Sequence, residues 1–292
     1  MKVKILKKQL KNLKMDKEQL KLELKANTIR QDIVKMIHEA KSGHPGGSLG
    51  MTDIFAAIYF DYLKVNPKKP KYPKRDYLVL SNGHICPVLY ATMAERGFFS
   101  KQRLLSLRKL GSKLQGHPHR ETLPGIETTS GPLGSGLSQA AGIALGLKMD
   151  KKKNKVVCLT SDGEHDEGNT WEAVMFAHKY NLNNLINIVD RNRIQISGST
   201  EDVLPLGSLK EKYLAFGWGV IEIDGNDMKQ IMHALKIAMH ERQKPLAIIA
   251  HTILGKGVHF MEGKPEWHGK APNDEELEKA LKDLKRQRER LE

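Results

Sequence analysis

Cysteine is almost missing from this chain, which excludes a disulfide-rich secreted domain and a cysteine-based metal site. Only two of the 292 residues are cysteines, Cys86 and Cys158. Two cysteines cannot form the disulfide framework of a small secreted domain, and neither belongs to a metal-binding pair. Cys158 lies in the apolar run "KVVCLT", where a small buried side chain is expected. We therefore expect a protein of the reducing cytoplasm.

Long apolar runs are also missing. No stretch approaches the roughly 18 consecutive apolar residues that a membrane-spanning helix needs. The first 20 residues contain lysines throughout and lack the apolar core of a signal peptide, while their acids and their lack of Arg and Ser argue against a transit peptide. We therefore expect a soluble, unprocessed protein with no membrane partner.

Positive charge is abundant, with a formal net charge of +14. Most of it lies in two segments: residues 1–25 carry nine lysines against three acids, and residues 64–75 carry six positive charges and no acid. Neither segment has interleaved aromatic residues or a nucleic-acid-binding motif. We therefore predict a solvated surface and no nucleic-acid partner. The positive field still favours an anionic substrate or cofactor.

Short apolar, β-branched runs alternate with helical patterns along most of the chain. The predicted strands are 76–84 including a terminal turn, 155–160, 185–190, 218–224 and 246–252, and the predicted helices are 52–63, 86–97, 137–150, 170–180 and 228–242. Buried strands that alternate with helices indicate a parallel sheet covered on both faces. The sequence therefore predicts an α/β fold.

Charged helices are expected on either side of this α/β part. Residues 1–25 predict a basic N-terminal helix, and a second helix is expected to begin at a capping box of Thr28 and Gln31. Residues 271–292 predict a charged, amphipathic C-terminal helix. Between them, residues 26–270 are predicted to form one α/β domain.

Polar residues follow two of the predicted strands. Asp162 comes just after strand 155–160, and Asn192 comes just after strand 185–190. The intervening helix predicts a right-handed β-α-β unit, so the strands are expected to be neighbours, with both residues at the sheet edge where ligands bind. A carboxylate, an amide oxygen and a nearby main-chain carbonyl suit a hard divalent cation such as Mg²⁺.

Other residues of the same unit predict ordinary structural roles. Glu164 and Asp166 indicate a solvated turn after the strand. The spacing of Trp171, Val174 and Met175 predicts the buried face of the following helix.

A glycine-rich turn predicts where a phosphate group binds. The segment "SGPLGSG" leads directly into helix 137–150. Glycines let the backbone approach a ligand closely, and the free N–H groups and dipole of a helix N-terminus favour an anion. Together with the predicted metal site, this turn suggests a metal–diphosphate cofactor.

Five separated motifs carry a family resemblance. They are "SGHPGGSLG" (42–50), "SNGH" (81–84), "QGHPH" (115–119), "GPLGSG" (131–136) and "HTILGKG" with "WHG" (within 251–269). In addition, "SDGEHDEGN" followed by "DRNRIQI" resembles the thiamine diphosphate motif. In this order, over residues 26–270, they resemble the N-terminal half of transketolase. The resemblance implies the thiamine diphosphate-binding fold.

The resemblance implies roles for individual residues. Asp162, Asn192 and the main-chain carbonyl of Ile194 match the ligands of Mg²⁺, for which Ca²⁺ or Mn²⁺ can substitute. Gly163 matches the backbone contact to the diphosphate. The departures at Ser161 and Arg191 fall on positions that supply no metal ligand in the family, so the metal assignment stands.

Further site residues come from the same resemblance. Gly131 and Leu133 match the loop that lines the cofactor, and Glu167 matches a carboxylate that links two cofactor sites at a subunit interface. Four histidines match the active-site histidines, of which two also bind the cofactor: His44, His84, His117 and His268, with His84 and His268 as the cofactor-binding pair. Neutral imidazoles suit this task because they both donate and accept hydrogen bonds near physiological pH. Neither His165 nor Asp166 receives a role.

The implied activity is a thiamine diphosphate-dependent transferase reaction of the pentose phosphate pathway. A two-carbon ketol unit passes from a ketose phosphate to an aldose phosphate. In the family, the pocket for the cofactor's pyrimidine ring and most substrate phosphate contacts lie in a following domain, which this sequence does not contain. The sequence could be a fragment of such an enzyme, but we expect one subunit of a split enzyme, active only with a C-terminal transketolase subunit in a two-plus-two heterotetramer.

Alternative functions remain open at this point. The chain could belong to another thiamine diphosphate-dependent ketol-transfer enzyme, or to one that resembles deoxyxylulose phosphate synthase. It could also be a non-catalytic cofactor-binding homologue. Product analysis distinguishes the first two from transketolase, and co-purification with a partner argues against the third.

Overall fold

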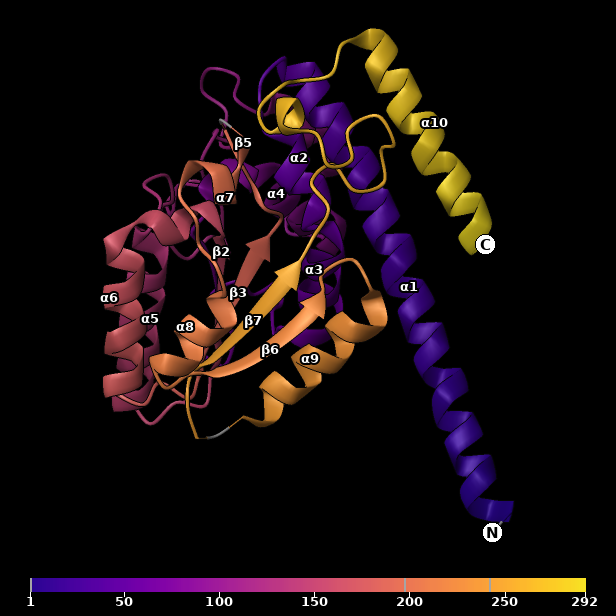
Figure 1. Ribbon diagram of the computed structural model, residues 1–292. Helices are drawn as coiled ribbons and strands as arrows, with labels where there is room; N and C mark the ends of the chain where they lie inside the picture. Colours follow the sequence, from indigo (N-terminus) through magenta and orange to yellow (C-terminus); the bar gives the residue numbers. More distant parts are fainter. Residues whose placement is uncertain (1, 197, 242) are drawn as a thin grey trace.

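A parallel sheet forms the centre of the molecule. A computed structural model of the chain describes the backbone of residues 2–196, 198–241 and 243–292 and, outside those gaps, the side chains from Lys17 onwards. In this part of the chain the sheet has five strands in the order β1-β2-β3-β7-β6 (Figure 1). The strands are Tyr77–Leu80 (β1), Val156–Ser161 (β2), Leu185–Arg191 (β3), Gly219–Asp224 (β6) and Leu246–His251 (β7). Each begins and ends within a residue of its prediction, except that β1 ends before the predicted turn.

Helices pack on both faces of the sheet, which confirms the predicted α/β fold. One face is covered by α1 (Lys2–Ala40), α3 (Thr52–Ala57), α4 (Cys86–Arg96) and α9 (Met228–His240), and the other by α5 (Ser135–Met149), α6 (Gly168–Lys179) and α8 (Leu209–Ala215). Alternate strand residues enter the two cores: Val157 and Leu159 face the first, and Val156 and Cys158 face the second. This alternation follows from the two-residue period of a strand.

Short elements complete the fold. They are α2 (Pro45–Gly50), the π-helical turn η1 (Ile58–Tyr62), η2 (Gly83–Ile85), η3 (Lys101–Ser106), η4 (Gly163–Asp166), the β4–β5 pair (Ile194–Gln195 and Gly198–Ser199), α7 (Thr200–Val203) and η5 (Pro265–Trp267). Predicted helix 52–63 corresponds to α3 and η1 together. The sequence did not predict α2, α7, α8 or the β4–β5 pair, because segments this short show no hydrophobic period.

The predicted helix start at Thr28 is wrong. A single helix, α1, runs through this position. The hydroxyl of Thr28 donates to the carbonyl of Leu24 (3.1 Å) and the amide of Gln31 donates to Asn27 (2.8 Å), so both side chains make bonds typical of a helix interior. No glycine or proline interrupts this part of the sequence, and the buried face of the helix continues through the position. The three-part division at residues 25 and 270 stays a prediction.

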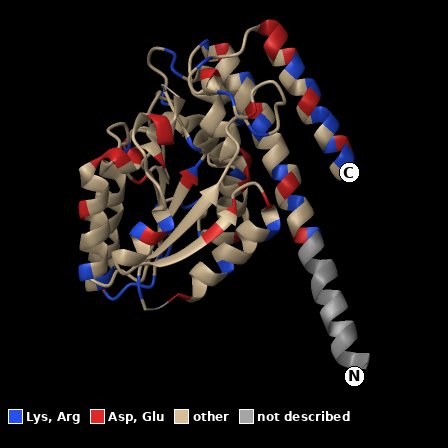
Figure 2. Cartoon of the chain, viewed as in Figure 1, with Lys and Arg blue, Asp and Glu red and all other residues tan. Residues whose placement is uncertain are grey.

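The C-terminal helix α10 (Asp274–Leu291) packs along α1. It begins with a real capping box, in which the side chain of Asn273 accepts from the N–H of Glu276 and the carboxylate of Glu276 accepts from the N–H of Asn273. Ala280 and Leu284 are fully buried on its inner face. Figure 2 shows acidic and basic residues along the rest of α10.

The predicted buried face of helix α6 is partly wrong. Val174 is buried, but Met175 is half exposed and Trp171 is partly buried. The face that packs on the sheet consists of smaller residues, among them Ala173 and Ala177. The large apolar residues therefore point away from the sheet, which leaves Met175 and its neighbours on the surface.

Candidate active site

A cavity opens at the C-terminal ends of the central strands. As predicted, β2 and β3 are parallel neighbours, with Ser161 opposite Asp190 in the register. Both strands deliver the following residues to a cavity of ≈ 440 Å³. Its walls are formed by His44, Gly47, His84, His117, Gly131, Leu133, Ser161, Asp162, Gly163, Asp190, Asn192, Ile194, Gln195, Ile196, Leu254 and His268. The structure therefore brings together every predicted site residue except Glu167.

The carboxylate of Asp162 is buried at the floor of this cavity. Its Oδ1 accepts from the N–H of Gly163 (2.8 Å), and its Oδ2 accepts from the N–H of Arg193 (2.6 Å) and from the guanidinium of Arg191 (3.3 Å). Burial raises the pKa of Asp162, although these bonds oppose the shift. Arg191, noted in the sequence as a departure, thus supplies a positive charge beside the carboxylate.

Asp190 is a site residue that the sequence reasoning missed. It is buried, accepts a hydrogen bond from the hydroxyl of Thr252, and its Oδ2 accepts from the amide nitrogen of Asn192 (3.0 Å). Burial and the nearby charge of Asp162 raise the pKa of Asp190 to about 7. Since a carboxylate accepts hydrogen bonds, this contact fixes which end of the Asn192 amide is nitrogen. The signal in the sequence was a charged residue inside the apolar run of β3.

Three histidines from distant segments form a cluster on the cavity wall. The ring centroids of His44, His84 and His268 lie 5.1 to 5.5 Å apart. Burial, with the neighbouring histidines and Arg108, lowers the pKa of His44 to about 4, and burial with the neighbouring histidines lowers that of His84 to about 3. Burial also lowers the pKa of His268. The cluster is therefore neutral near physiological pH.

His117 lines the same cavity from the loop before α5. Burial and the charge of Arg108 lower its pKa. Two other histidines lie elsewhere. His119 accepts from the N–H of Glu121 in its own loop, and His251, at the end of β7, contacts Glu222.

The glycine-rich loop lines the cavity, and two of its N–H groups bind protein side chains. Gly131 and Leu133 are on the cavity wall. The N–H of Gly134 donates to the Oε1 of Glu164 (2.8 Å), and the N–H of Gly136 donates to the hydroxyl of Ser81 (3.0 Å). Protein side chains therefore use these two N–H groups, and phosphate binding at the start of α5 stays a prediction.

Glu164 is not the solvated turn residue that the sequence predicted. Its side chain is fully buried and accepts from the hydroxyl of Ser81, from the N–H of Gly134 and from the N–H of Ser161 (3.2 Å). Burial raises its pKa to about 7. The carboxylate thus joins the ends of β1 and β2 to the glycine-rich loop.

The structure assigns places to the residues left without a role. His165 is buried, with Nδ1 bonded to the carbonyl of Ser161 (2.8 Å) and Nε2 to the hydroxyl of Tyr213 (2.9 Å). Burial lowers its pKa to about 4. Asp166 accepts from the amide of Gln195 (2.9 Å), a residue of the cavity wall.

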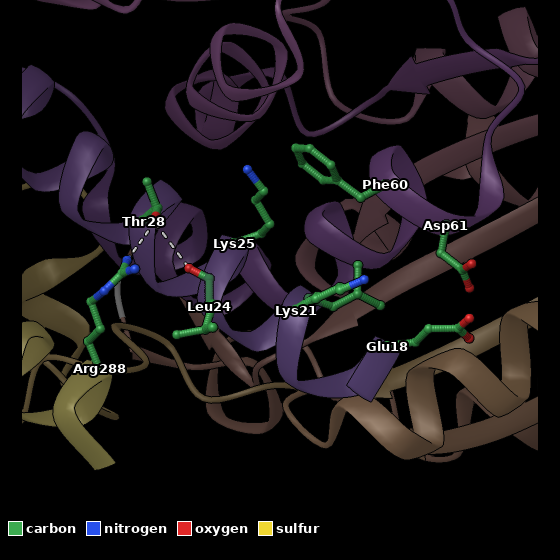
Figure 3. A pocket seen from close by; sticks show the side chains of 9 residues that line it. Glu18, Lys21, Leu24, Lys25, Thr28, Phe60, Asp61 and Arg288 are labelled. Carbon is green, nitrogen blue, oxygen red and sulfur yellow. Dashed lines mark hydrogen bonds between the residues drawn. The ribbon is translucent and has the colours of Figure 1, made fainter. Parts of the chain in front are cut away.

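A second groove, of ≈ 400 Å³, lies where α1, η1 and α10 meet (Figure 3). Leu22, Leu24 and Phe60 form its apolar part, and charged side chains such as Lys21 and Arg288 surround them. None of the predicted site residues lines it. The groove is therefore separate from the strand-end cavity.

Comparison with known proteins identifies the family. The family model described as "Transketolase, thiamine diphosphate binding domain" matches residues 22–289. The chain belongs to the transketolase family. This confirms the resemblance carried by the motifs.

Relatives of the same length as this chain are named as transketolase subunits. One, from Phocaeicola vulgatus, is a subunit of apulose-4-phosphate transketolase; it is 43% identical over 271 residues, which cover 93% of this chain and 96% of the relative. The "6-deoxy-6-sulfo-D-fructose transketolase subunit SqwG" of Clostridium sp. is 40% identical, covering 94% of this chain and 99% of the relative.

Longer transketolases match over part of their length. The crystal structure of transketolase from Campylobacter jejuni is 34% identical with a TM-score of 0.85, and the match covers 93% of this chain and 45% of that one. Human transketolase is 38% identical over 247 residues, which cover 84% of this chain and 39% of the human protein. The chain thus spans less than half of these transketolases.

The donor set of the cavity fits a divalent cation that shares its coordination with a diphosphate. Asp162, Asn192 and Ile194 all line one cavity, although among the described residues no group of three or more His, Cys, Asp or Glu could hold a metal. One carboxylate with neutral oxygens is the expected protein share for Mg²⁺, which takes its remaining ligands from phosphate and water. The residues of this transketolase chain therefore fit the metal.

Gly163 lies against the side chain of Gln195, since a Cβ placed on this glycine would lie 3.0 Å from that side chain. Glu167, the predicted site residue outside the cavity, is exposed at the start of α6 and packs beside Gly134. It therefore lies near the cavity but faces outwards.

Proposed function

We propose that this chain is the diphosphate-binding subunit of a two-chain transketolase that moves a two-carbon ketol unit from a ketose phosphate to an aldose phosphate. The observation that carries the proposal is the meeting, in one cavity, of an oxygen donor set with a cluster of neutral histidines. A cytoplasmic place in the pentose phosphate pathway belongs to the same proposal. No helix in the described part of the chain is long and apolar enough to cross a membrane.

Different residues of the cavity bind the metal ion, the diphosphate and the rest of the cofactor. Asp162, Asn192 and the carbonyl of Ile194 hold Mg²⁺, or Ca²⁺ or Mn²⁺ in its place, and the backbone at Gly163 contacts the diphosphate. Gly131 and Leu133 line the cofactor. When bound, thiamine diphosphate supplies the electron sink for breaking the carbon–carbon bond beside a ketone.

The histidines act on the sugar. Because His44, His84, His117 and His268 all have lowered pKa values, their neutral rings can each donate one hydrogen bond and accept another. They bind the hydroxyl groups of the donor sugar and exchange protons with them, and His84 and His268 also contact the cofactor. Positively charged histidines could only donate hydrogen bonds and could not accept them.

A partner subunit completes the enzyme in this proposal. The two subunit relatives have the length of this chain, and the chain spans less than half of the long transketolases. An exposed apolar face on α5 and α6 supports a protein partner: Met149, Met175, Phe176 and Tyr180. Helix α5 begins just after Leu133 of the cavity wall and α6 begins just after Glu167. We therefore assign this face to the subunit that carries the pyrimidine-binding domain, in a two-plus-two assembly.

The substrate could differ from the usual pentose phosphates. The relatives of equal length are named for apulose 4-phosphate and for 6-deoxy-6-sulfo-D-fructose. Both names describe ketoses with an anionic group, as in the pentose phosphates. A ketose with a terminal phosphate or sulfonate is therefore the class of donor to test.

The decisive experiment is co-expression with a C-terminal transketolase subunit, followed by a transferase assay with thiamine diphosphate and Mg²⁺. Xylulose 5-phosphate, apulose 4-phosphate and the sulfofructose serve as donors, and ribose 5-phosphate and glyceraldehyde 3-phosphate serve as acceptors. We expect turnover of at least one donor by the complex and none by this chain alone. Full activity of the chain alone would contradict the two-chain proposal, and a pyruvate-dependent reaction would favour a deoxyxylulose phosphate synthase-like subunit.

A further inference from the structure

Arg108 is a cation close to the cavity that the proposed function does not use. It lies in the loop after η3 and is absent from the cavity wall. None of the arginine ion pairs among the described residues includes it. Its Nε is buried without a hydrogen-bond partner. A charge kept in this position without a carboxylate partner requires an explanation.

One side of the guanidinium contacts the loop of His44. Its Nη1 donates to the hydroxyl of Ser42 at 3.0 Å. Ser42 precedes His44 by two residues, just before α2 begins at Pro45. The arginine therefore fixes the backbone that carries the first histidine of the cluster.

The flat face of the guanidinium lies on the loop of His117. A Cβ placed on Gly116 would lie 2.9 Å from Cζ, 3.0 Å from Nε and 3.1 Å from Nη2 of Arg108. Glycine is therefore required at this position for the guanidinium to rest on the backbone. The next residue along the chain is His117.

Helix α4 holds the same loop from another direction. The thiol of Cys86 donates to the carbonyl of Gly116 (3.1 Å), and the hydroxyl of Tyr90 donates to the carbonyl of Gln115 (3.0 Å). Arg108 and α4 thus both hold the loop in front of His117. The arginine therefore adds to the contacts with α4 that fix this segment.

The backbone of Arg108 is itself constrained. Its φ is 59°, in the left-handed region, and its N–H donates to the carbonyl of Leu114 (2.8 Å). A non-glycine residue in this region costs about 1 kcal/mol or more, and such conformations concentrate at functional sites. The loop therefore holds the guanidinium in place at an energetic cost.

We propose that Arg108 is a positioning residue that sets the distance between His44 and His117 by binding Ser42 and covering Gly116. The expected effect of Arg108 on catalysis rests on the proposed function. Its charge also favours the neutral forms of both imidazoles. Burial is the largest cause of the lowered pKa of His44, to which His268, Arg108 and His117 add, and burial together with Arg108 lowers the pKa of His117.

The test compares three variants with a matched control. Arg108→Gln removes the charge and the flat guanidinium, Arg108→Lys removes the guanidinium alone, and Gly116→Ala displaces the guanidinium while leaving the arginine in place. Arg103→Gln is the control, because Arg103 is an exposed arginine on η3 that packs on Phe99 and touches neither histidine loop.

Two measurements distinguish positioning from simple stability. In the reconstituted complex, we expect all three variants to lower kcat/KM about 10- to 100-fold, the range expected for a small misplacement of catalytic groups, with unchanged affinity for thiamine diphosphate. In NMR titrations of the full chain, we expect Arg108→Gln to move the histidine midpoints of His44 and His117 to higher pH, and Arg108→Lys to leave them near the wild-type values.

Wild-type kcat/KM and wild-type histidine titrations in Arg108→Gln would overturn the inference. Equal losses in Arg103→Gln would also overturn it, since they would point to a general effect of arginine removal. A wild-type complex without transferase activity would contradict the proposed function instead. In that case the histidine titrations alone would test the role of Arg108.

Discussion

Asp162 is the residue on which metal binding depends most in the proposed site, since it is the single carboxylate of the donor set. We expect Asp162→Ala to weaken Mg²⁺-dependent binding of thiamine diphosphate by more than about 100-fold, because the loss of a mere supporting contact already costs 10- to 100-fold. Calorimetric titration measures this in the reconstituted complex. The exposed Asp150→Asn serves as the control, and unchanged affinity in Asp162→Ala would remove the basis for the metal site.

The protonation of Glu164 makes the free energy of unfolding depend on pH. Its pKa rises from 4.5 to about 7 on folding, so the folded state binds its proton more tightly. The contribution of the protonated Glu164 to the stability of the folded chain is fully present below pH 4.5 and declines as the pH rises through 7. We therefore expect the free energy of unfolding of wild type, relative to Glu164→Gln, to fall between pH 5 and pH 8 by up to ~1.4 kcal/mol per pH unit.

Urea unfolding at several pH values measures this difference. Glu172→Gln, on the exposed side of α6, is the control and should follow the wild type at every pH. A constant difference between wild type and Glu164→Gln over the range would show that Glu164 titrates normally.

The histidine cluster is expected to stay neutral in mildly acidic solution. Folding lowers the pKa of His44 from 6.5 to about 4 and that of His84 from 6.5 to about 3. The unfolded chain therefore binds more protons between these values, and the contribution of both rings to stability falls as the pH drops from 6.5. NMR titration should give both midpoints below 6.5, and a midpoint at or above 6.5 would contradict a desolvated cluster.

At the scale of single elements, the capping box of α10 and the capping-box pattern inside α1 predict different outcomes for similar changes. Asn273 is the N-cap of α10, whereas Thr28 lies inside α1. We expect Asn273→Ala to cost about 1 kcal/mol, the usual loss for an N-cap, and Thr28→Ala to cost less. Hydrogen exchange of the first amides of α10 measures the cap directly. Equal effects of both substitutions would contradict this difference.

The elements show which parts of the fold the sequence could predict. Strands such as β3 were predictable because an apolar, β-branched run signals a buried strand without tertiary information. The continuity of α1 through Thr28 was not, since a Thr-x-x-Gln pattern occurs equally well inside a helix. The face of α6 was mispredicted because hydrophobic spacing does not say whether the sheet or the outside receives the larger side chains.

The sequence could predict a site residue when its place in the site follows from its position just after a strand. Asp162 and Asn192 followed from the parallel order of β2 and β3. Asp190 and Glu164 did not, because their partners, Thr252 among them, come from segments far away in sequence. Buried carboxylates look like solvated ones until the segments around them are placed.

At the scale of the whole molecule, the apolar face of α5 and α6 is expected to bind the partner subunit. We expect Phe176→Glu to prevent co-purification with the partner while leaving the fold of this chain intact, because a charge on this face would be desolvated in the complex. Ile237→Glu on α9 is the matched control, since Ile237 is 40% exposed and Phe176 is 38% exposed. Size-exclusion chromatography and circular dichroism provide the two measurements. Normal complex formation by Phe176→Glu would place the interface elsewhere.

The cluster of His44, His84 and His268 joins the beginning of the α/β domain to its end, and this has a consequence for folding kinetics. Contacts between residues so distant in sequence require large loops to close, and such contacts form slowly. The rings reach their separations of 5.1 to 5.5 Å only after the segments between them have been placed. A ligand that requires all of them can bind only the completed chain. Cofactor added during refolding should therefore not accelerate the early phases, and its stabilising effect should appear in the unfolding rate.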